Sequence, residues 1–401
     1  MALLSTEKRD HTLYIVLCER IDANNIDEIK KEIDEAIEDE SITFVTADAK
    51  NLAYISSIGL REIMRLKKRF RDLKIIHVSD EVYDIFDLTK FTDIIQVERE
   101  HRVISVEGCP VLGKGAAGTV YKLDDETIVK VFGADYAYNK IERERDNSRN
   151  AFFHGVDTAI PFDIVRVGEN FGLIYEIINA DTLKNVMLRD RGNLAGHMTT
   201  YAMYVKDMHR VVVDEPLYPD MKKGWIEKIK SLEGVFSDNE KGRVIDFLEK
   251  IPDKRNFVHG DVNFGNFMVS NGKALVIDME DVVLGDPVFD VSFIYYLISI
   301  LPELLPAELC EMVTGFTAEE NALMWKTFSN IYFDISTEEE RRRIEKKLYP
   351  YASIKLLEVM PWYYSILRNA DDSIKQFVPK LYDAFRDAEK KHKAGLMEAM
   401  G

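Results

Sequence analysis

Residues 257–286 carry the side chains best suited to chemistry. They read FVHGDVNFGNFMV, a turn at 270–273, then ALVIDMED and, further on, GDP. Two apolar runs flank the turn, so a hairpin would bring Asp261 and Asn266 close to Asp278. Phosphoryl transfer to a hydroxyl needs one carboxylate that orients the hydroxyl and accepts its proton, and oxygen ligands for Mg²⁺. The segment predicts Asp261 as catalytic base and Asn266 and Asp278 as metal ligands.

Ordinary turn aspartates and asparagines are the structural alternative for these residues. The full H-G-D-x4-N, I-D and G-D-P spacing makes that alternative weak, because several independent parts of one site occur in the expected order.

A glycine-rich segment of the form G-x-G-x-x-G-x-V contains Gly113, Gly115, Gly118 and Val120. Small residues allow backbone N–H groups to approach phosphate oxygens closely. A dinucleotide-binding turn would lead into a helix, whereas here a β-branched strand follows and the chain returns along residues 127–132. The hairpin favours a flap over the phosphates of ATP; a glycine-rich hairpin without a ligand is the alternative.

Lys130 lies inside the apolar run IVKVF. A buried ammonium is costly unless a phosphate or carboxylate meets it, so this lysine needs a partner. The following helical segment offers Glu142 and Glu144, and we prefer Glu144. The alternative is an exposed lysine on an edge strand, with glutamates that only solvate a helix face.

With these motifs in place, residues 105–400 resemble the aminoglycoside phosphotransferase and choline kinase superfamily of small-molecule kinases. The resemblance implies a protein-kinase-like fold with a β-rich N-lobe and a mainly helical C-lobe. It also implies that Lys130 contacts the nucleotide, that Glu144 is its ion-pair partner, and that a hinge near Glu176 and Ile178 touches adenine. By the same resemblance His259 holds the loop, and the loop is supported by Asp286 and Asp290.

The sequence departs from that superfamily inside the catalytic loop. Residues 262–265 read VNFG where a proline and a histidine-like residue are usual. This difference prevents assignment to a named subfamily. The chain also has no D-F-G, no A-P-E and no activation loop, which argues against an ordinary protein-serine kinase.

The helical C-terminal block should provide the site for the phosphate acceptor. Carboxylates and aromatic faces could hold an ammonium-bearing alcohol, such as an aminoglycoside, choline or another amino alcohol. The available side chains are Glu319, Glu320, Asp334 and the cluster Trp362, Tyr363 and Tyr364. A helix surface of this kind is more often core plus solvated face, so we name no acceptor residue.

Residues 12–97 alternate between strands and helices, as expected for a compact α/β unit. Ser56 or Ser57 can cap a helix that begins near Ile58, and Gly59 permits close packing. Residues 5–100 resemble STAS domains such as the anti-sigma-factor antagonists. In those domains a serine at the position of Ser57 can be phosphorylated to control partner binding; a plain helix cap is the simpler alternative.

Composition restricts the remaining possibilities. The 401 residues are 46% hydrophobic and 31% charged, which is enough for several cores. A formal charge of −17 argues against nucleic acid as a partner, and no stretch is long and apolar enough to span a membrane. Three cysteines far apart in sequence, without a CxxC pair, fit a reducing cytoplasm.

The sequence thus predicts a STAS-like domain over residues 1–100, a kinase-like N-lobe over 101–180 and a helical C-lobe over 181–401. The leading hypothesis is a phosphotransferase that uses ATP or GTP with Mg²⁺ and a small-molecule hydroxyl as acceptor. A protein partner of the STAS module is expected beside it. The alternative is a signalling protein whose kinase-like part binds nucleotide as a scaffold or phosphorylates a STAS serine, Ser57 included.

Overall fold

The computed structural model describes residues 3–115, 117–270, 273–370 and 375–400. The chain forms two compact units. Unit 1 comprises Met1–Ser105 and Val165–Glu169, and unit 2 comprises Val106–Ile164 and Asn170–Gly401. Within the described ranges, no helix is both long enough and apolar enough to cross a membrane.

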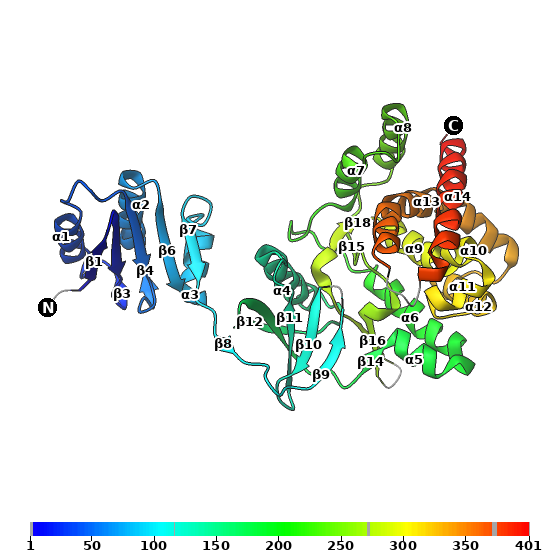
Figure 1. The fold of residues 1–401 in the computed structure, drawn as a ribbon, viewed down its shortest axis with the longest axis horizontal. Coiled ribbons are helices and arrows are strands. Elements are labelled where there is room, and N and C mark those ends of the chain that lie inside the picture. Colours follow the sequence, from blue (N-terminus) through cyan, green and yellow to red (C-terminus); the bar gives the residue numbers. More distant parts are fainter. Residues whose placement is uncertain (1–2, 116, 271–272, 371–374, 401) are drawn as a thin grey trace. The chain divides into compact units, whose positions relative to one another are not determined.

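Unit 1 is an α/β unit in which strands and helices alternate (Figure 1). Its elements are β1 (Ser5–Arg9), β2 (Thr12–Val16), β3 (Arg20–Ile21), α1 (Ile26–Ala36), β4 (Phe44–Asp48), β5 (Tyr54–Ile55), α2 (Ser57–Arg69), β6 (Leu73–Val78), α3 (Asp80–Leu88), β7 (Gln96–Arg99) and β8 (Val103–Ile104).

Five strands of unit 1 form one sheet in the order β1-β2-β4-β6-β7. The pairs β2–β4, β4–β6 and β6–β7 are parallel, while β1 is antiparallel to β2. In β2, Leu13 and Ile15 are buried and their neighbours are half-buried, so one face of the sheet meets the helices. The α/β alternation expected over residues 12–97 is confirmed.

The start of α2 shows why small residues occur there. A Cβ on Gly59 would lie 2.7 Å from side-chain carbons of both Ile21 and Ile55, so only glycine fits. Ser56 occupies the N-cap position, but its side chain makes no capping hydrogen bond. Ser57 is the first helical residue and is exposed. Neither serine therefore acts as a side-chain cap, which corrects that part of the expectation.

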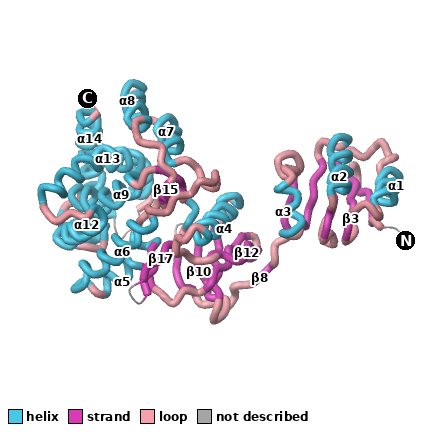
Figure 2. The backbone as a smooth tube through the Cα atoms, turned by 180° about the vertical axis from the view of Figure 1, so that it is seen from behind, coloured by secondary structure: helices cyan, strands magenta, loops and turns pink. Residues whose placement is uncertain are grey.

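The first part of unit 2 is a sheet with one helix (Figure 2). Strands lie side by side in the order β12-β13-β11-β10-β9. Their bounds are β9 (Val111–Lys114), β10 (Gly118–Lys122), β11 (Thr127–Phe132), β12 (Pro161–Val167) and β13 (Asn170–Glu176), with α4 (Tyr138–Phe153) between β11 and β12. The end of β12, from Val165 on, is counted with unit 1. Helix α4 is the helical segment expected to carry Glu142 and Glu144.

The second part of unit 2 is mainly helical. Its helices are α5 (Leu183–Arg189), α6 (Leu194–Met208), α7 (Met221–Ser231), α8 (Asp238–Glu249), α9 (Val288–Tyr295), α10 (Leu301–Leu304), α11 (Ala307–Thr314), α12 (Ala318–Phe333), α13 (Glu338–Arg368) and α14 (Val378–Ala399). The short strands are β14 (Asp181–Thr182), β15 (Asn256–Val258), β16 (Phe267–Ser270), β17 (Lys273–Val276) and β18 (Val283–Gly285).

A continuous apolar core joins this helical part to the short strands. Tyr201 on α6, Phe267 on β16 and Phe328 on α12 are almost fully buried, and the ring of Tyr201 contacts the rings of the other two. The antiparallel pairs β15–β18 and β16–β17 rest on this core. The loops that leave these strands, including a 3₁₀ turn at Met279–Asp281 (η3), are thereby held in place.

Candidate functional site

Lys130 lies at the centre of the sheet, on β11. It is paired across the sheet with Val120 on β10 and with Leu173 on β13. Its Nζ lies 2.8 and 2.9 Å from the two carboxylate oxygens of Glu144 on α4, and 3.0 Å from Oδ1 of Asp278. The lysine is therefore the point at which the sheet, α4 and the segment after β17 meet.

The surroundings of this lysine favour its charged form. Burial by itself lowers the pKa of Lys130, but the carboxylates of Glu144 and Asp278 outweigh burial and leave that pKa above its ordinary value. Glu144 also accepts a hydrogen bond of 2.5 Å from the hydroxyl of Tyr175 on β13. Burial, reinforced by the Glu144 charge, raises the pKa of Tyr175, so this hydroxyl stays a donor. The sequence analysis did not identify Tyr175. The one indication was its hydroxyl group in an otherwise apolar strand.

The loop after β15 holds Asp261 by both carboxylate oxygens. Asn263 donates from Nδ2 to Oδ1 at 2.9 Å, and Asn266 donates from Nδ2 to Oδ2 at 2.9 Å. Asn263 also accepts from the backbone N–H of Gly265, which starts the 3₁₀ turn Phe264–Asn266. The carboxylate is half-buried and fixed in orientation, as a group that accepts a proton from a bound hydroxyl must be. Asn263 was noted only as a departure from the usual loop; the structure shows it in contact with Asp261.

Asp290 holds the backbone at the start of this loop. Its two oxygens accept backbone N–H groups of His259 at 2.8 Å and Gly260 at 2.9 Å, and it also accepts from His209 at 3.0 Å. Burial by itself raises the pKa of Asp290, but the hydrogen bonds and charges of His209 and His259 outweigh it and hold that pKa below its ordinary value. Gly260 has φ of +84°, and a Cβ there would lie 2.5 Å from the carbonyl oxygen of Asp281.

The other expected supports of the loop are also placed. The ring of His259 contacts the carbonyl of Ile277 through Nε2 at 3.1 Å and is almost fully buried. Asp286 accepts from the backbone N–H of Val288 at the start of α9 and pairs with Lys254 at 2.8 Å. His259 and Asp290 thus have supporting contacts, while Asp286 stabilises the start of α9.

The β16–β17 hairpin brings Asn266 next to Asp278. Phe267 pairs with Val276, and the backbone N–H of Ile277 donates to the carbonyl of Asn266 at 2.8 Å. The turn residues Asn271 and Gly272 lie outside the described residues. An amide oxygen and a carboxylate are hard oxygen donors of the kind that Mg²⁺ takes together with substrate phosphates. The donor set of Asn266 and Asp278 therefore fits the expected metal.

The glycine-rich hairpin is formed by β9 and β10. The backbone N–H of Gly115 donates to the carbonyl of Gly118 at 2.9 Å. A Cβ on Gly118 would collide with the carbonyl of Val131, whereas Gly113 and Gly115 face open space. Gly118 is thus required by packing and the other two leave room for a ligand. Ala116, inside the motif, lies outside the described residues.

The expected hinge lies at the end of β13. Glu176 pairs with Thr127 on β11, and its Oε1 accepts from the backbone N–H of Ile160 at 3.3 Å. Ile178 packs against the apolar cluster that contains Leu173 and Tyr175. Both residues lie at the connection from the sheet to the helical part, and their contact with adenine stays a prediction.

The acidic and aromatic residues considered for the acceptor have structural partners. Glu320 completes a capping box with Thr317 at the start of α12 and pairs with Arg191 at 2.7 Å. Asp334 pairs with Lys206 at 2.6 Å. The hydroxyl of Tyr363 accepts a hydrogen bond from Tyr296, and the hydroxyl of Tyr364 donates one to Glu389. Glu319 lies in the first turn of α12. Trp362 is exposed. These contacts agree with core and helix-surface roles.

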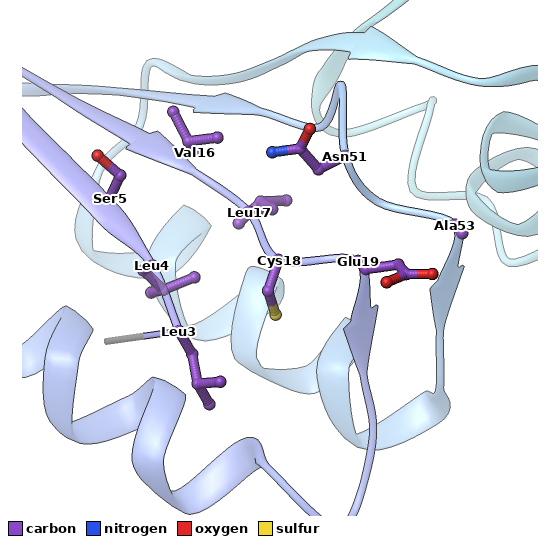
Figure 3. Close-up of a pocket in the computed structure, with 9 residues that line it drawn as sticks. All are labelled: Leu3, Leu4, Ser5, Val16, Leu17, Cys18, Glu19, Asn51 and Ala53. Atoms are coloured by element: carbon purple, nitrogen blue, oxygen red, sulfur yellow. The ribbon is translucent and has the colours of Figure 1, made fainter. Parts of the chain in front are cut away.

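A cavity of about 640 Å³ lies in unit 1 (Figure 3). It is lined by the N-terminal segment, the end of β2 and the loop before β5, with the residues Leu3, Leu4, Ser5, Val16, Leu17, Cys18, Glu19, Asn51 and Ala53. None of the residues with an expected role in phosphoryl transfer lines this cavity. The candidate site is instead the set of side chains around Lys130 and Asp261.

A glycine-rich hairpin, a buried lysine–glutamate pair and a loop carrying aspartate and asparagine define a kinase-like phosphotransferase fold. The sequence model of the phosphotransferase enzyme family matches residues 108–314, and the model of the STAS domain matches residues 4–103. The chain belongs to the phosphotransferase enzyme family, and a STAS domain precedes its kinase-like part. Both resemblances and the expected fold class are confirmed. Among curated proteins, none matches this sequence.

Several solved structures are similar to the chain. One is a choline/ethanolamine kinase family protein from Mesorhizobium loti, with 17% identity, coverage of 73% of this chain and 88% of that chain, and a TM-score of 0.46. Another is the ADP-bound aminoglycoside phosphotransferase APH(2'')-Ib, with 16% identity, coverage of 78% and 98%, and a TM-score of 0.46. A thermostable mutant of APH(4)-Ia, in ternary complex with AMP-PNP and hygromycin B, has 13% identity, coverage of 73% and 93%, and a TM-score of 0.47.

Proposed function

We propose that this chain transfers the γ-phosphoryl group of ATP or GTP to a hydroxyl of a small molecule, such as an amino alcohol, an aminoglycoside or a sugar. The observation that carries the proposal is the contact of Lys130 with both Glu144 and Asp278, beside a loop that fixes Asp261 by two amide donors. A family member without chemistry would have no need for this complete arrangement.

In the proposed reaction Asp261 orients the acceptor hydroxyl and takes its proton. The new bond joins the acceptor oxygen to the γ-phosphorus, and the bond between that phosphorus and the bridging oxygen of the nucleoside diphosphate breaks. Lys130, held by Glu144, would contact the α- and β-phosphates. Asn266 and Asp278 would hold Mg²⁺, which offsets the negative charge of the phosphates when bound.

The remaining assignments follow the expected division of the chain. We assign the STAS module to residues 1–100, the nucleotide-binding lobe with Gly113, Gly115, Gly118 and Val120 to 101–180, and the catalytic lobe to 181–401. Adenine would meet the hinge at Glu176 and Ile178. We propose the cytoplasm as the compartment because all three cysteines are free thiols.

A second candidate function concerns the STAS module. Ser57 is exposed at the first position of α2, where backbone N–H groups and the helix dipole favour a phosphate. Ser57 is therefore a candidate phosphosite that would control binding of a protein partner. The kinase-like part of the same chain is one candidate donor.

The decisive experiment measures ADP or GDP release with MgATP and MgGTP against amino alcohols, aminoglycosides and sugars, with intact-mass analysis of the protein in the same tubes. Acceptor-dependent turnover without a change in protein mass supports the small-molecule kinase. A gain of one phosphate mass that disappears in Ser57→Ala supports the signalling alternative. Asp261→Asn is the control for both, and acceptor-dependent release that persists at the wild-type level in this variant would remove Asp261 from the role of base.

A further inference from the structure

A polar stripe runs along one face of α4 and the turn before it. Tyr136, Lys140, Glu144 and Asn147 are spaced by four, four and three residues, the spacing of one helix face. Glu144 faces Lys130, as described above. The other three side chains reach η3, the turn that directly follows Asp278.

Glu280 is the centre of these contacts. Its Oε1 lies 2.7 Å from Nζ of Lys140, and its Oε2 accepts a hydrogen bond from the hydroxyl of Tyr136. The side chain of Glu280 is only 15% exposed, so its charge requires such donors. Asn147 donates from Nδ2 to the carbonyl of Met279 at 2.7 Å and to that of Glu280 at 3.3 Å. Side chain and backbone of the turn are both tied to α4.

The position of Asp278 depends on this turn. Its backbone has φ of 64°, in the left-handed region that non-glycine residues avoid without support from their surroundings. Its Oδ1 contacts Lys130, which is itself fixed to α4 through Glu144. One helix therefore sets the positions of both groups, Lys130 for the phosphates and Asp278 for Mg²⁺, that the proposed function assigns to the nucleotide.

We call the contacts of Tyr136 and Lys140 with Glu280 the clamp. Tyr136 links this clamp to the sheet. Its ring stacks on Phe132 at the end of β11, with centroids 4.8 Å apart and planes inclined by 27°. The ammonium of Lys140 lies 5.4 Å from the centroid of the Tyr136 ring. The phenol of Tyr136 thus lies between β11, the strand that carries Lys130, and the carboxylate of Glu280.

We propose that Tyr136 and Lys140 are positioning residues that act through Glu280. They fix the turn after Asp278 against α4, so that Asp278 and Lys130 are in place before a nucleotide binds. This inference rests on the proposed function for its kinetic consequence, but the clamp itself is a property of the protein without nucleotide. The competing explanation is that Glu280 contacts Mg²⁺ directly, with Tyr136 and Lys140 as incidental neighbours.

Hydrogen exchange of the full chain without nucleotide or metal tests the clamp directly. We expect faster exchange in both α4 and residues 277–285 in Tyr136→Phe, Lys140→Met and Glu280→Gln. Lys122→Met is the matched control, because Lys122 is another lysine of the same sheet paired with a carboxylate, Asp125, at 2.7 Å. Unchanged exchange in both segments in all three clamp variants overturns the proposal, whether or not the protein turns over nucleotide.

Kinetics then distinguish positioning from metal binding. We expect KM for the nucleotide to rise about tenfold in each clamp variant, with a smaller change in kcat and none in the control. In the Glu280→Gln background, Lys140→Met should have no further effect. A higher Mg²⁺ requirement in Glu280→Gln alone, with Tyr136→Phe and Lys140→Met like wild type, overturns the proposal in favour of a metal ligand. Absence of any wild-type turnover would count against the proposed function and leaves the exchange experiment to decide the clamp.

Discussion

Lys130 and Asp278 lie 148 residues apart in sequence and 3.0 Å apart in the fold, measured from Nζ to Oδ1. The contact joins the central strand of the sheet to the turn after the β16–β17 hairpin. Glu144 is 1% exposed and Asp278 is 37% exposed. The charge of Glu144 therefore depends more strongly on Lys130 than the charge of Asp278 does. The first prediction follows from this asymmetry.

Lys130→Met should destabilise unit 2 by about 3 kcal/mol, because it leaves the buried Glu144 without its cation. The double variant Lys130→Met with Glu144→Leu should recover much of that loss, since two apolar groups replace the pair. Chemical unfolding of the full chain, followed by a probe in unit 2, measures both. Lys122→Met is the control for loss of a paired lysine, and equal destabilisation in it would refute the argument.

Asp261→Asn should abolish turnover and leave nucleotide affinity largely unchanged. The amide cannot accept the proton of the acceptor hydroxyl, but it retains the shape of the loop. Steady-state kinetics and titration with a nucleotide analogue measure the two effects separately. Turnover close to that of wild type would remove Asp261 from the role of base.

Asn263 should influence kcat through the orientation of Asp261. Asn263→Ala removes the donor to Oδ1, and we expect kcat to fall about tenfold with little change in nucleotide KM. Asn263→Asp keeps an acceptor for the N–H of Gly265 but places a like charge beside Asp261, so it should be at least as slow. If both variants keep wild-type kcat, the two hydrogen bonds on Asp261 are not needed for its orientation.

Gly118→Ala should damage the glycine-rich hairpin, whereas Gly113→Ala should be tolerated structurally. A Cβ at position 118 meets the backbone of Val131, while position 113 faces open space. We expect a lower thermal midpoint in the first variant and an unchanged midpoint in the second. If the nucleotide KM then rises in Gly113→Ala without loss of stability, a phosphate of the nucleotide lies close to the backbone at Gly113.

His392 should make the stability of unit 2 dependent on pH. It is buried on α14, where Nδ1 contacts the hydroxyl of Ser353 at 2.9 Å, and burial lowers the pKa of His392 from 6.5 to about 4. Above pH 6.5 neither state binds the proton. As pH falls from 6.5 to about 4, the unfolded chain binds it and the folded chain does not, so stability is lost.

Unfolding midpoints of wild type and His392→Gln, measured at several pH values across this window, test the effect. The variant should be less stable at neutral pH because it loses the ring contact with Tyr349. Its free energy of unfolding should change less steeply with pH, by a slope that corresponds to at most one bound proton. Parallel curves for the two proteins would contradict a buried neutral histidine.

The sequence by itself was informative wherever the signal is local. The alternation of strands and helices over residues 12–97 and the helical segment that carries Glu142 and Glu144 were predicted, and the structure contains both. The loop with Asp261 and Asn266 was identifiable because its residues lie within a few positions of one another. By contrast β1, an edge strand with every residue exposed, had no apolar pattern and was missed.

Only the tertiary structure decided which distant groups meet. The sequence favoured Glu144 over Glu142 as the partner of Lys130, and the packing of α4 on the sheet is what places Glu144 in contact with that lysine. The contacts of Glu280 with Tyr136 and Lys140 depend on how η3 packs against that helix. Residue types and short spacings determine local structure and the chemistry available, because those effects act over a few residues. Burial and long-range packing of the folded chain determine which of these groups become one site.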